Sequence, residues 1–590
     1  MGKSPFYIFS HKKRKNLYGK KYVNTKRRKI NLNEIGISTS NKDHTVWDLV
    51  IPYIQDPQDR AAVSLVCPQW CHVDAITRRH VTIDFCHTAA PDSLFRRFPL
   101  LNSLEISGCP PDIFGLIFGD WKSYITPWLR EIADREIKAL DFQRMIVNDS
   151  DLDLLATSVA GKVLEVLKLN RCSGFSTDGL LHIVRSCGRL RTLSIEGSYI
   201  IENDGEWLHE LALRNTTLEN LNFFMSSLVK IRPGDLELIA RNCASLVSMK
   251  IGDCDVSDLN SFFHASTVLE EFAGSYIYNA NEVKFPPRLC RLNLNFMHYA
   301  VREVIPVASR FIELDLRTSH IDREGHCLLL KSCPNLKILK TTCAIGDSGL
   351  VDLAQFCKRM KKLRIYGYGE CREARAVTER GLIALSMGCR ELEYLTIYGS
   401  NITNDALECV GRYLKNLCDL RLVLIKTPYD SYDIDASLDN GIQLLLMGCP
   451  QLRRFDLFLH ERWLTDKGFE FIGRYGKNVK WMRFGNLRVS EEGISKFFKH
   501  CTRLQKLEMW KCQIDERALG RAVRKLTSLK YLWVEGTKDT SITRDLARML
   551  RKNWMVELIP SKVTSDGLKY ELSFCHVGHF VKYCKRMSNE

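Results

Sequence analysis

The chain has 590 residues, of which 45% are hydrophobic and 26% charged, and its formal net charge is +16. This length predicts several domains or an extended array rather than one compact core. No run of about 18 apolar residues occurs, and the amino terminus lacks a secretory core, so we expect an intracellular protein with no membrane span. Its 22 cysteines are then expected to be thiols.

Residues 1–42 form a basic tail. They hold twelve Lys or Arg against one acid, Glu34, and include the clusters HKKRK (11–15) and KRRK (26–29). Basic segments of this kind are recognised by nuclear import receptors or bind polyanions, and recognition by an import receptor favours a nuclear protein. A plain solvated tail is the alternative. No groove-reading helix or stacking platform is evident, so we do not expect a nucleic-acid partner.

Residues 43–84 predict a small helical module. Apolar residues from Val46 to Ile54 indicate a first helix, Asp56 and Pro57 break it, Arg60–Trp70 indicates a second, and a third runs to about residue 80. The module has more apolar surface than so few residues can bury. This favours docking of a partner, with packing as the amino-terminal cap of the next domain as the alternative.

A repeat runs through residues 85–560. Most steps between units are 20–28 residues, as in leucine-rich repeats, and helical stretches such as 177–187, 379–389 and 466–476 separate the strand-like ones. We therefore predict an α/β leucine-rich-repeat solenoid of about 17–18 repeats, closed by a cap at 561–590 whose apolar spacing permits a helix. The first leucine-type positions of the units are 101, 137, 164, 190, 218, 246, 269, 289, 311, 336, 360, 392, 417, 452, 479, 504 and 529.

Seven of the 22 cysteines occupy one register, the same position in their repeats, at a helix end just before the strand. This position predicts buried structural thiols rather than redox or metal sites. Looser groups around Cys67 and Cys575 lack paired zinc-finger spacing. The register contains Cys187, Cys243, Cys333, Cys357, Cys389, Cys449 and Cys501.

Three repeats carry long insertions after the strand, at 107–128, 366–381 and 426–441. Insertions at one point of a solenoid repeat gather on one rim, which favours a binding site over variable surface loops. They are rich in aromatic residues: Phe114, Phe118, Trp121, Tyr124, Tyr366, Tyr368, Tyr429 and Tyr432.

Cations alternate with the buried leucines of the strands, so they are expected on the concave face. Like charges so close repel unless an anion neutralises them, which leaves a salt-screened face or a bound polyanion. These cations are Lys168, Lys250, Lys340, Lys362, Arg364, Arg421, Arg454, Arg483 and Lys506.

The stretch YIQDPQDRAAVSLVCPQW resembles an F-box, and NLCDLRLVL, CSGFSTDGLL and ELEYLTIYGSNIT resemble the plant coronatine-insensitive jasmonate co-receptor family over nearly the whole chain. The resemblance implies a non-catalytic receptor subunit of a cullin-RING ubiquitin ligase, joined through a Skp adaptor. It also implies a structural inositol polyphosphate, a jasmonoyl–amino acid ligand and capture of jasmonate ZIM-domain repressors. Consistently, the chain has no P-loop, Gly-x-Ser-x-Gly or His-Glu-x-x-His.

The resemblance also implies site residues. For the hormone pocket they are Arg364, Tyr398, Arg421, Phe114, Leu116, Val423, Phe458, Arg483, Trp510 and Trp533, and for the polyphosphate Arg144, Lys362, Arg364 and Arg421. For the adaptor they are Val46, Leu49, Ile54, Pro57, Leu65, Val66 and Trp70.

The chain departs from the family pattern at several of these positions. Phe458, Arg483 and Trp510 stand where the family has a tyrosine, a leucine and an arginine, and the first long loop lacks the family's basic run. We therefore expect a divergent co-receptor with altered ligand preference. The alternatives are a receptor that needs no small ligand, a scaffold without ligase function, and a non-functional relative.

Overall fold

A computed structural model describes residues 46–54, 57–83, 86, 89–108, 123–203, 206–228, 231–252, 254–274, 276, 283–295, 301–367, 377–425, 437–510, 512–524, 526, 528–529, 531–536, 555–560, 570–576 and 579–585. The chain divides into two compact units, Met1–Arg78 and Arg79–Glu590. The described part of the first unit is helical, and the second unit consists of repeated strands and helices.

The first unit contains α1 (Val46–Val50), η1 (Ile51–Tyr53), α2 (Pro57–Val63) and α3 (Pro68–Thr77). Its small core is built from Ile51, Val63 and Val73, and Ile54 and Trp70 pack against it. Beside this core, the Arg60 Nε lies 2.8 Å from the Asp74 carboxylate, which is fully buried. A buried carboxylate needs such a partner, so this ion pair ties α2 to α3.

Two details differ from the sequence-based expectation for this unit. The single helix expected over Arg60–Trp70 is wrong, because α2 ends at Val63 and a new helix begins at Pro68. Cys67 is extended, and its Sγ accepts a hydrogen bond from the Trp70 N–H, so Pro68 takes the first helical position, where a missing N–H costs nothing. Residues 80–83, expected in the helical module, form a strand of the second unit.

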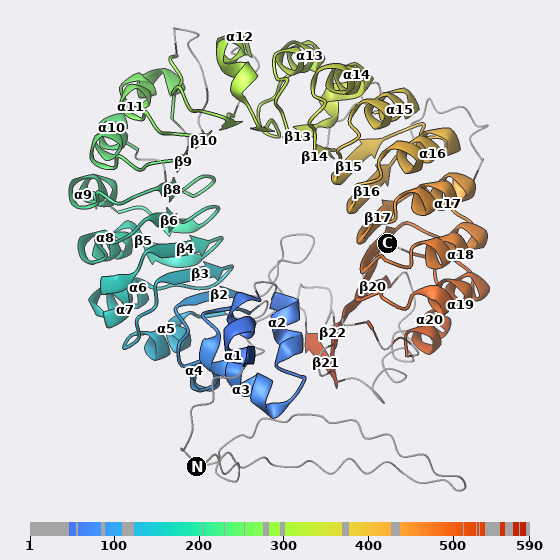
Figure 1. The fold of residues 1–590 in the computed structure, drawn as a ribbon, viewed down its shortest axis with the longest axis horizontal. Coiled ribbons are helices and arrows are strands. Elements are labelled where there is room, and N and C mark those ends of the chain that lie inside the picture. Colours follow the sequence, from blue (N-terminus) through green and yellow to red (C-terminus); the bar gives the residue numbers. More distant parts are fainter. Residues whose placement is uncertain are drawn as a thin grey trace, which may run out of the picture. The chain divides into compact units, whose positions relative to one another are not determined.

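The second unit is organised around one long sheet in which the strands of neighbouring repeats are parallel (Figure 1). In spatial order these strands are β1 (His80–Ile83), β2 (Ser103–Ser107), β3 (Ala139–Gln143), β4 (Val166–Asn170), β6 (Thr192–Ser194), β8 (Asn220–Asn222), β9 (Ser248–Lys250), β10 (Glu271–Ala273), β11 (Arg291–Asn293), β12 (Glu313–Asp315), β13 (Ile338–Thr342), β14 (Lys362–Tyr366), β15 (Tyr394–Gly399), β16 (Asp419–Leu424), β17 (Arg454–Phe458), β18 (Trp481–Gly485), β19 (Lys506–Trp510) and β20 (Tyr531–Gly536). A short parallel pair, β5 (Ser173–Ser176) and β7 (Tyr199–Ile201), forms a second sheet.

The solenoid prediction is confirmed. Every one of the seventeen leucine-type positions is buried, and each lies two residues before one of the strands β2, β3, β4, β6 and β8 to β20. The strand β1 adds a repeat before the first one expected. Alternate strand residues are buried, as in β14 and β15, so the remaining side chains line the other face of the sheet.

Helices of this unit lie on the outer side of the curved sheet, and the strands lie on the inner side (Figure 1). They are α4 (Pro91–Arg97), α5 (Thr126–Ile132), α6 (Asp149–Thr157), α7 (Val159–Val163), α8 (Thr177–Ser186), α9 (Trp207–Arg214), α10 (Pro233–Asn242), η3 (Val256–Leu259), α11 (Asn260–Ala265), α12 (Val301–Val304), η4 (Ile305–Arg310), α13 (Arg323–Lys331), η5 (Cys343–Ile345), α14 (Gly346–Phe356), α15 (Glu379–Gly388), α16 (Asn404–Tyr413), α17 (Asp439–Gly448), α18 (Asp466–Tyr475), α19 (Glu491–His500) and α20 (Glu516–Val523).

The cysteine register occupies the ends of these helices, as expected. All seven thiols are buried and free, and six of them are the residues that follow a helix. The Cys357 Sγ, for example, donates to the carbonyl of Cys333 in the preceding repeat, at 3.3 Å. Burial raises the pKa of the Cys389 thiol to about 12, so this thiol stays protonated and unreactive. Cys343 is disulfide-bonded, which corrects the expectation of thiols throughout.

The carboxyl-terminal segment is built from strands. The chain forms β21 (Met555–Pro560), β22 (Tyr570–His576) and β23 (His579–Lys585), with antiparallel pairing between β21 and β22 and between β22 and β23. Because β23 pairs in parallel with β20, these strands extend the sheet past the last repeat. The helix that the apolar spacing permitted is therefore not formed over 570–576 or 579–585.

Candidate ligand-binding face

Side chains on β14 to β19 form three rows across the concave face, because their strands are paired in register. The first row runs Lys362, Tyr394, Asp419, Arg454, Trp481 and Lys506. The second runs Arg364, Thr396, Arg421, Asp456, Arg483 and Glu508. The third, towards the carboxyl ends of the strands, includes Tyr398, Val423, Phe458, Gly485 and Trp510. Seven predicted pocket residues, one on β14 and six on β15 to β19, thus share one surface.

Most concave-face cations have a carboxylate partner, whereas the sequence-based expectation considered only a salt-screened face or a bound polyanion. Because these acids lie on the same or neighbouring strands, the protein itself supplies the counter-charge. The pairs are Lys168–Asp141 at 3.2 Å, Lys250–Glu271 at 2.8 Å, Lys340–Glu313 at 3.0 Å, Arg421–Asp419 at 3.2 Å, Arg454–Asp456 at 2.9 Å, Arg483–Glu508 at 2.5 Å and Lys506–Glu508 at 2.7 Å.

The densest part of this arrangement is the β16–β19 ion cluster, which we define as Asp419, Arg421, Arg454, Asp456, Arg483, Lys506 and Glu508. Four cations and three carboxylates leave it with one excess positive charge. Burial alone would lower the pKa of Arg421, but its hydrogen bond to Asp419 and the charge of Asp456 outweigh burial and raise it. Burial would likewise raise the pKa of Glu508, and Arg483 and Lys506 reverse this and lower it. Arg421 and Glu508 are therefore charged at neutral pH.

The strand β14 differs, since its two cations have no carboxylate partner among the described residues. The Lys362 Nζ lies 4.4 Å from the centre of the Tyr394 ring, a cation–π contact. The structure shows no hydrogen bond or ion pair to the Arg364 guanidinium within the parts of the chain it describes. Uncompensated positive charge on this part of the face therefore centres on β14, where a ligand carboxylate or phosphate would be favoured.

The third row consists mainly of aromatic and apolar side chains. A Cβ on Gly367 would lie 2.4 Å from the Tyr398 ring, and one on Gly485 would lie 2.1 Å from the Phe458 ring. The two glycines thus let these aromatic rings lie directly over the neighbouring strand. The Arg483 guanidinium carbon lies 5.8 Å from the centre of the Trp510 ring, a cation–π contact. Two positions at which the sequence departs from the family pattern therefore interact with each other. Sequence reasoning did not identify either glycine.

Other predicted pocket residues fall elsewhere. Phe114 and Leu116 lie outside the described residues, as does most of each long loop, so the expected lid is not tested. Trp533 lies on β20, and its side chain is not described. Arg144 directly follows β3, with a left-handed φ of 56°, and is separated in the sheet order from β14 by eight strands. The structure therefore does not unite Arg144 with the three rows.

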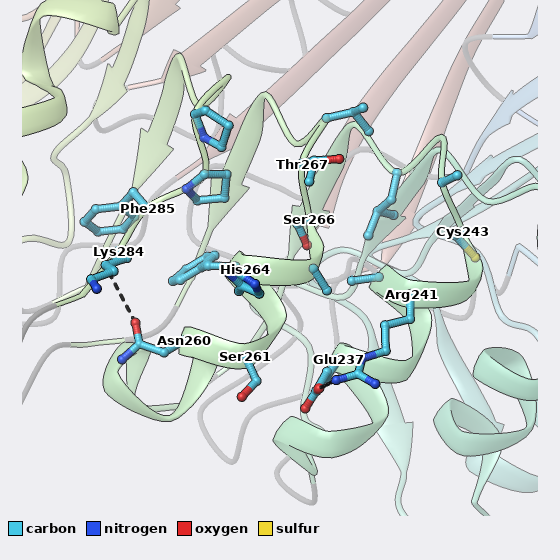
Figure 2. Close-up of a pocket in the computed structure, with 18 residues that line it drawn as sticks. Glu237, Arg241, Cys243, Asn260, Ser261, His264, Ser266, Thr267, Lys284 and Phe285 are labelled. Atoms are coloured by element: carbon cyan, nitrogen blue, oxygen red, sulfur yellow. Dashed lines mark hydrogen bonds and ion pairs between the residues drawn. The ribbon is translucent and has the colours of Figure 1, made fainter.

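A pocket of about 890 Å³ lies elsewhere in this unit, beside α10 and α11 (Figure 2). Its lining includes Glu237, Arg241, His264, Lys284 and Phe285, and Figure 2 shows the first two paired with each other. None of the predicted ligand residues lines it. A smaller pocket of about 110 Å³ lies within the β16–β19 ion cluster and is lined by Asp456, Arg483 and Glu508 among others.

The first unit carries an exposed apolar surface. Leu49, Leu65 and Val66, all predicted adaptor residues, are 67%, 79% and 60% exposed. Ile54 and Trp70, which were assigned the same role, instead pack against the unit's own core. The side chains of Val46 and Pro57 are not described. Tyr53, four residues after Leu49, is also 79% exposed and was not in the predicted set. So much exposed apolar area on so small a unit indicates a protein partner.

The described residues contain no group of three or more His, Cys, Asp or Glu side chains placed to hold a metal ion. None of their helices combines the length and the hydropathy needed to cross a membrane.

Comparisons with known proteins cover both the helical unit and the solenoid. A family model described as F-box matches residues 39–80. Coronatine-insensitive protein 1 of Arabidopsis thaliana is 47% identical over 560 residues, which cover 91% of this chain and 93% of that protein. From rice, Oryza sativa subsp. indica, Coronatine-insensitive protein homolog 1a is 44% identical over 88% of this chain and 90% of its own length. Homolog 2 from the same source is 40% identical over 89% and 92%.

Proposed function

Because the chain belongs to the coronatine-insensitive protein family, we propose that it is the substrate-recognition F-box subunit of an SCF-type cullin-RING ubiquitin ligase. In this proposal the apolar surface at Leu49, Leu65 and Val66 docks on a Skp adaptor, as a helical groove partner. The solenoid then presents its substrate. The receptor performs recognition only, and the other subunits supply the chemistry.

The substrate we propose is a jasmonate ZIM-domain repressor, captured together with a jasmonoyl–amino acid. One observation supports a small acidic ligand best: the Arg364 guanidinium has no partner within the described residues. Arg364 also lies two strands from Arg421 in the same row of the concave face. Arginine suits a carboxylate because its N–H groups match both oxygens. Tyr398, Val423 and Phe458 in the next row supply apolar contacts for the rest of the ligand.

An inositol polyphosphate is the second ligand that the proposal includes. Lys362 and Arg364 would contact it, and Arg144 offers a further cation at the end of β3. Arg421 fits it less well, because this side chain is already bonded to Asp419. We also propose that the protein acts in the nucleus, which the two basic clusters of residues 1–42 support.

Capture of the repressor tests this proposal. The chain, co-expressed with a Skp adaptor, is passed over an immobilised repressor degron peptide with and without jasmonoyl-isoleucine. Retention only with the hormone is expected. Arg364→Ala should lower the hormone affinity by roughly 2–5 kcal/mol, since the ligand carboxylate loses its cation. The matched control is Arg359→Ala, an exposed arginine just before the same strand, which should behave as the wild type.

A receptor that needs no hormone is the second candidate. One observation favours it: Arg421 and Arg483 are neutralised by the chain's own carboxylates, so the C-terminal part of the face is stable without an anion. Retention of the peptide without hormone, unchanged by Arg364→Ala, would support this candidate and contradict the first.

A further inference from the structure

The buried carboxylate of Asp456 lies at the centre of the concave face's arginines. It is 2% exposed and lies on β17, in register between Arg421 on β16 and Arg483 on β18. Its Oδ2 lies 2.9 Å from Arg454, 3.5 Å from Arg421 and 4.0 Å from Arg483. One carboxylate therefore faces three guanidinium groups on three consecutive strands.

We propose that Asp456 is a specificity-determining residue: it acts as a built-in counter-anion that makes this part of the ligand-binding face select ligands of low charge over polyanions. The inference rests on the proposed function, since it concerns the ligand of the same face. It names the class of ligand favoured there, a molecule with a single carboxylate.

The geometry separates the two ligand classes. A guanidinium has five N–H donors, so an arginine that holds Asp456 keeps donors for one further carboxylate. A ligand with several phosphates brings much more negative charge, and that charge is repelled by the buried Asp456 and by its neighbours Asp419 and Glu508. If the arginines used all their N–H donors to bind a polyanion, the buried Asp456 carboxylate would lose its compensating cations. Burying an unpaired carboxylate costs free energy, so this rearrangement is unfavourable.

Binding measurements on the full chain in complex with a Skp adaptor test this inference. Isothermal titration calorimetry with inositol hexakisphosphate should show that Asp456→Asn binds at least about tenfold more tightly than the wild type, the size of one coupling between close charges. The affinity for jasmonoyl-isoleucine, with one carboxylate, should change much less. The gain should shrink as salt is added, because it is electrostatic.

The matched control is Asp315→Asn. Asp315 is 6% exposed, lies in the same row on β12, and pairs with Arg317 and Lys340, but it lies outside the β16–β19 ion cluster. This control should leave hexakisphosphate binding unchanged. An equal gain in the control, or unchanged or weaker binding by Asp456→Asn, would overturn the inference.

A second variant covers the case in which Asp456→Asn does not fold. The double variant Asp456→Ala/Arg454→Leu removes both members of the 2.9 Å ion pair, so it leaves no buried Arg454 without its partner and does not change the net charge. It should also bind hexakisphosphate more tightly than the wild type, and wild-type affinity here contradicts the inference. Failure of repressor capture would refute the proposed function alone, because hexakisphosphate binding is read out directly.

Discussion

Glu508 shows how single residues hold the concave face together. Its side chain is 6% exposed and accepts from Arg483 at 2.5 Å and from Lys506 at 2.7 Å. Both contacts require the carboxylate form, and the pKa of Glu508 is lowered because these cations outweigh the effect of burial. A group whose folded-state pKa is lowered stabilises the fold above its unfolded-state pKa and loses this contribution as the pH falls through the folded value.

The first prediction concerns this residue. At pH 7, Glu508→Gln should destabilise the fold by roughly 1.5–3 kcal/mol, since two charge-assisted hydrogen bonds to a buried group are lost. The difference between variant and wild type should persist down to about pH 4.5, the ordinary value for the group, and disappear below it. Thermal unfolding followed at a series of pH values measures this.

The control for that measurement is Glu492→Gln. Glu492 pairs with Lys496 on the surface of α19, and its side chain is 73% exposed. Exposed pairs of this kind contribute little, so its unfolding temperature should stay close to that of the wild type at every pH. A pH-independent loss of stability in Glu508→Gln would show that shape rather than charge is responsible.

At the scale of elements, neighbouring repeats are joined by close helix packing and by repeated hydrogen bonds. A first-turn aspartate of one helix accepts from the N-cap residue of the next, as when Asp439 accepts from the Thr465 N–H at 3.0 Å. The helices α16 and α17 approach so closely that a Cβ on Gly448 would lie 2.1 Å from the Gly411 carbonyl oxygen. Only glycine permits that contact.

We predict that Gly448→Ala destabilises the solenoid by about 1–3 kcal/mol, because the added methyl group forces the two backbones apart. Gly188→Ala, at an exposed position that follows α8 by two residues, is the control, since its Cβ would meet nothing within 4 Å. Denaturant unfolding of both variants measures the difference. Equal midpoints for the two would contradict the proposed close packing.

For the whole molecule, the two compact units have separate cores and separate surfaces, which indicates separate tasks. In the first unit Leu65 is 79% exposed and is not part of its hydrophobic core. The concave face of the second unit instead combines two charged and polar rows with one aromatic and apolar row. A change on one surface should therefore leave the other intact.

The corresponding prediction uses Leu65→Glu. A buried charge at an apolar interface is strongly unfavourable, so co-purification of a Skp adaptor should fall about tenfold or more. The thermal unfolding temperature should stay unchanged, because the side chain is exposed. Leu213→Glu, a 57% exposed leucine on α9 of the second unit, is the control and should retain the adaptor. Loss of the adaptor in both variants would contradict a specific surface at Leu65.

Periodicity identified the repeats well, because one buried position per unit, such as Leu336 or Leu392, repeats along the whole solenoid. The same alternation placed Arg421, Arg454 and Arg483 on the concave face. It also places Asp456 and Glu508 there, each two residues after a cation of the same strand, but these acids were not considered with the cations. For that reason the sequence-based alternatives, a salt-screened face or a bound polyanion, did not include neutralisation by the chain's own carboxylates.

The sequence by itself determined the solenoid, the buried cysteine register and the concave-face position of the strand cations, because each follows from spacing along the chain. Only the tertiary structure decided which charges meet. Register between neighbouring strands brings Asp456 beside Arg421 and Arg483, which are 35 and 27 residues away in sequence, and leaves Arg364 beside Thr396 with no carboxylate partner among the described residues. Electrostatic energy depends on distance in space, so spacing along the chain could not assign these pairs.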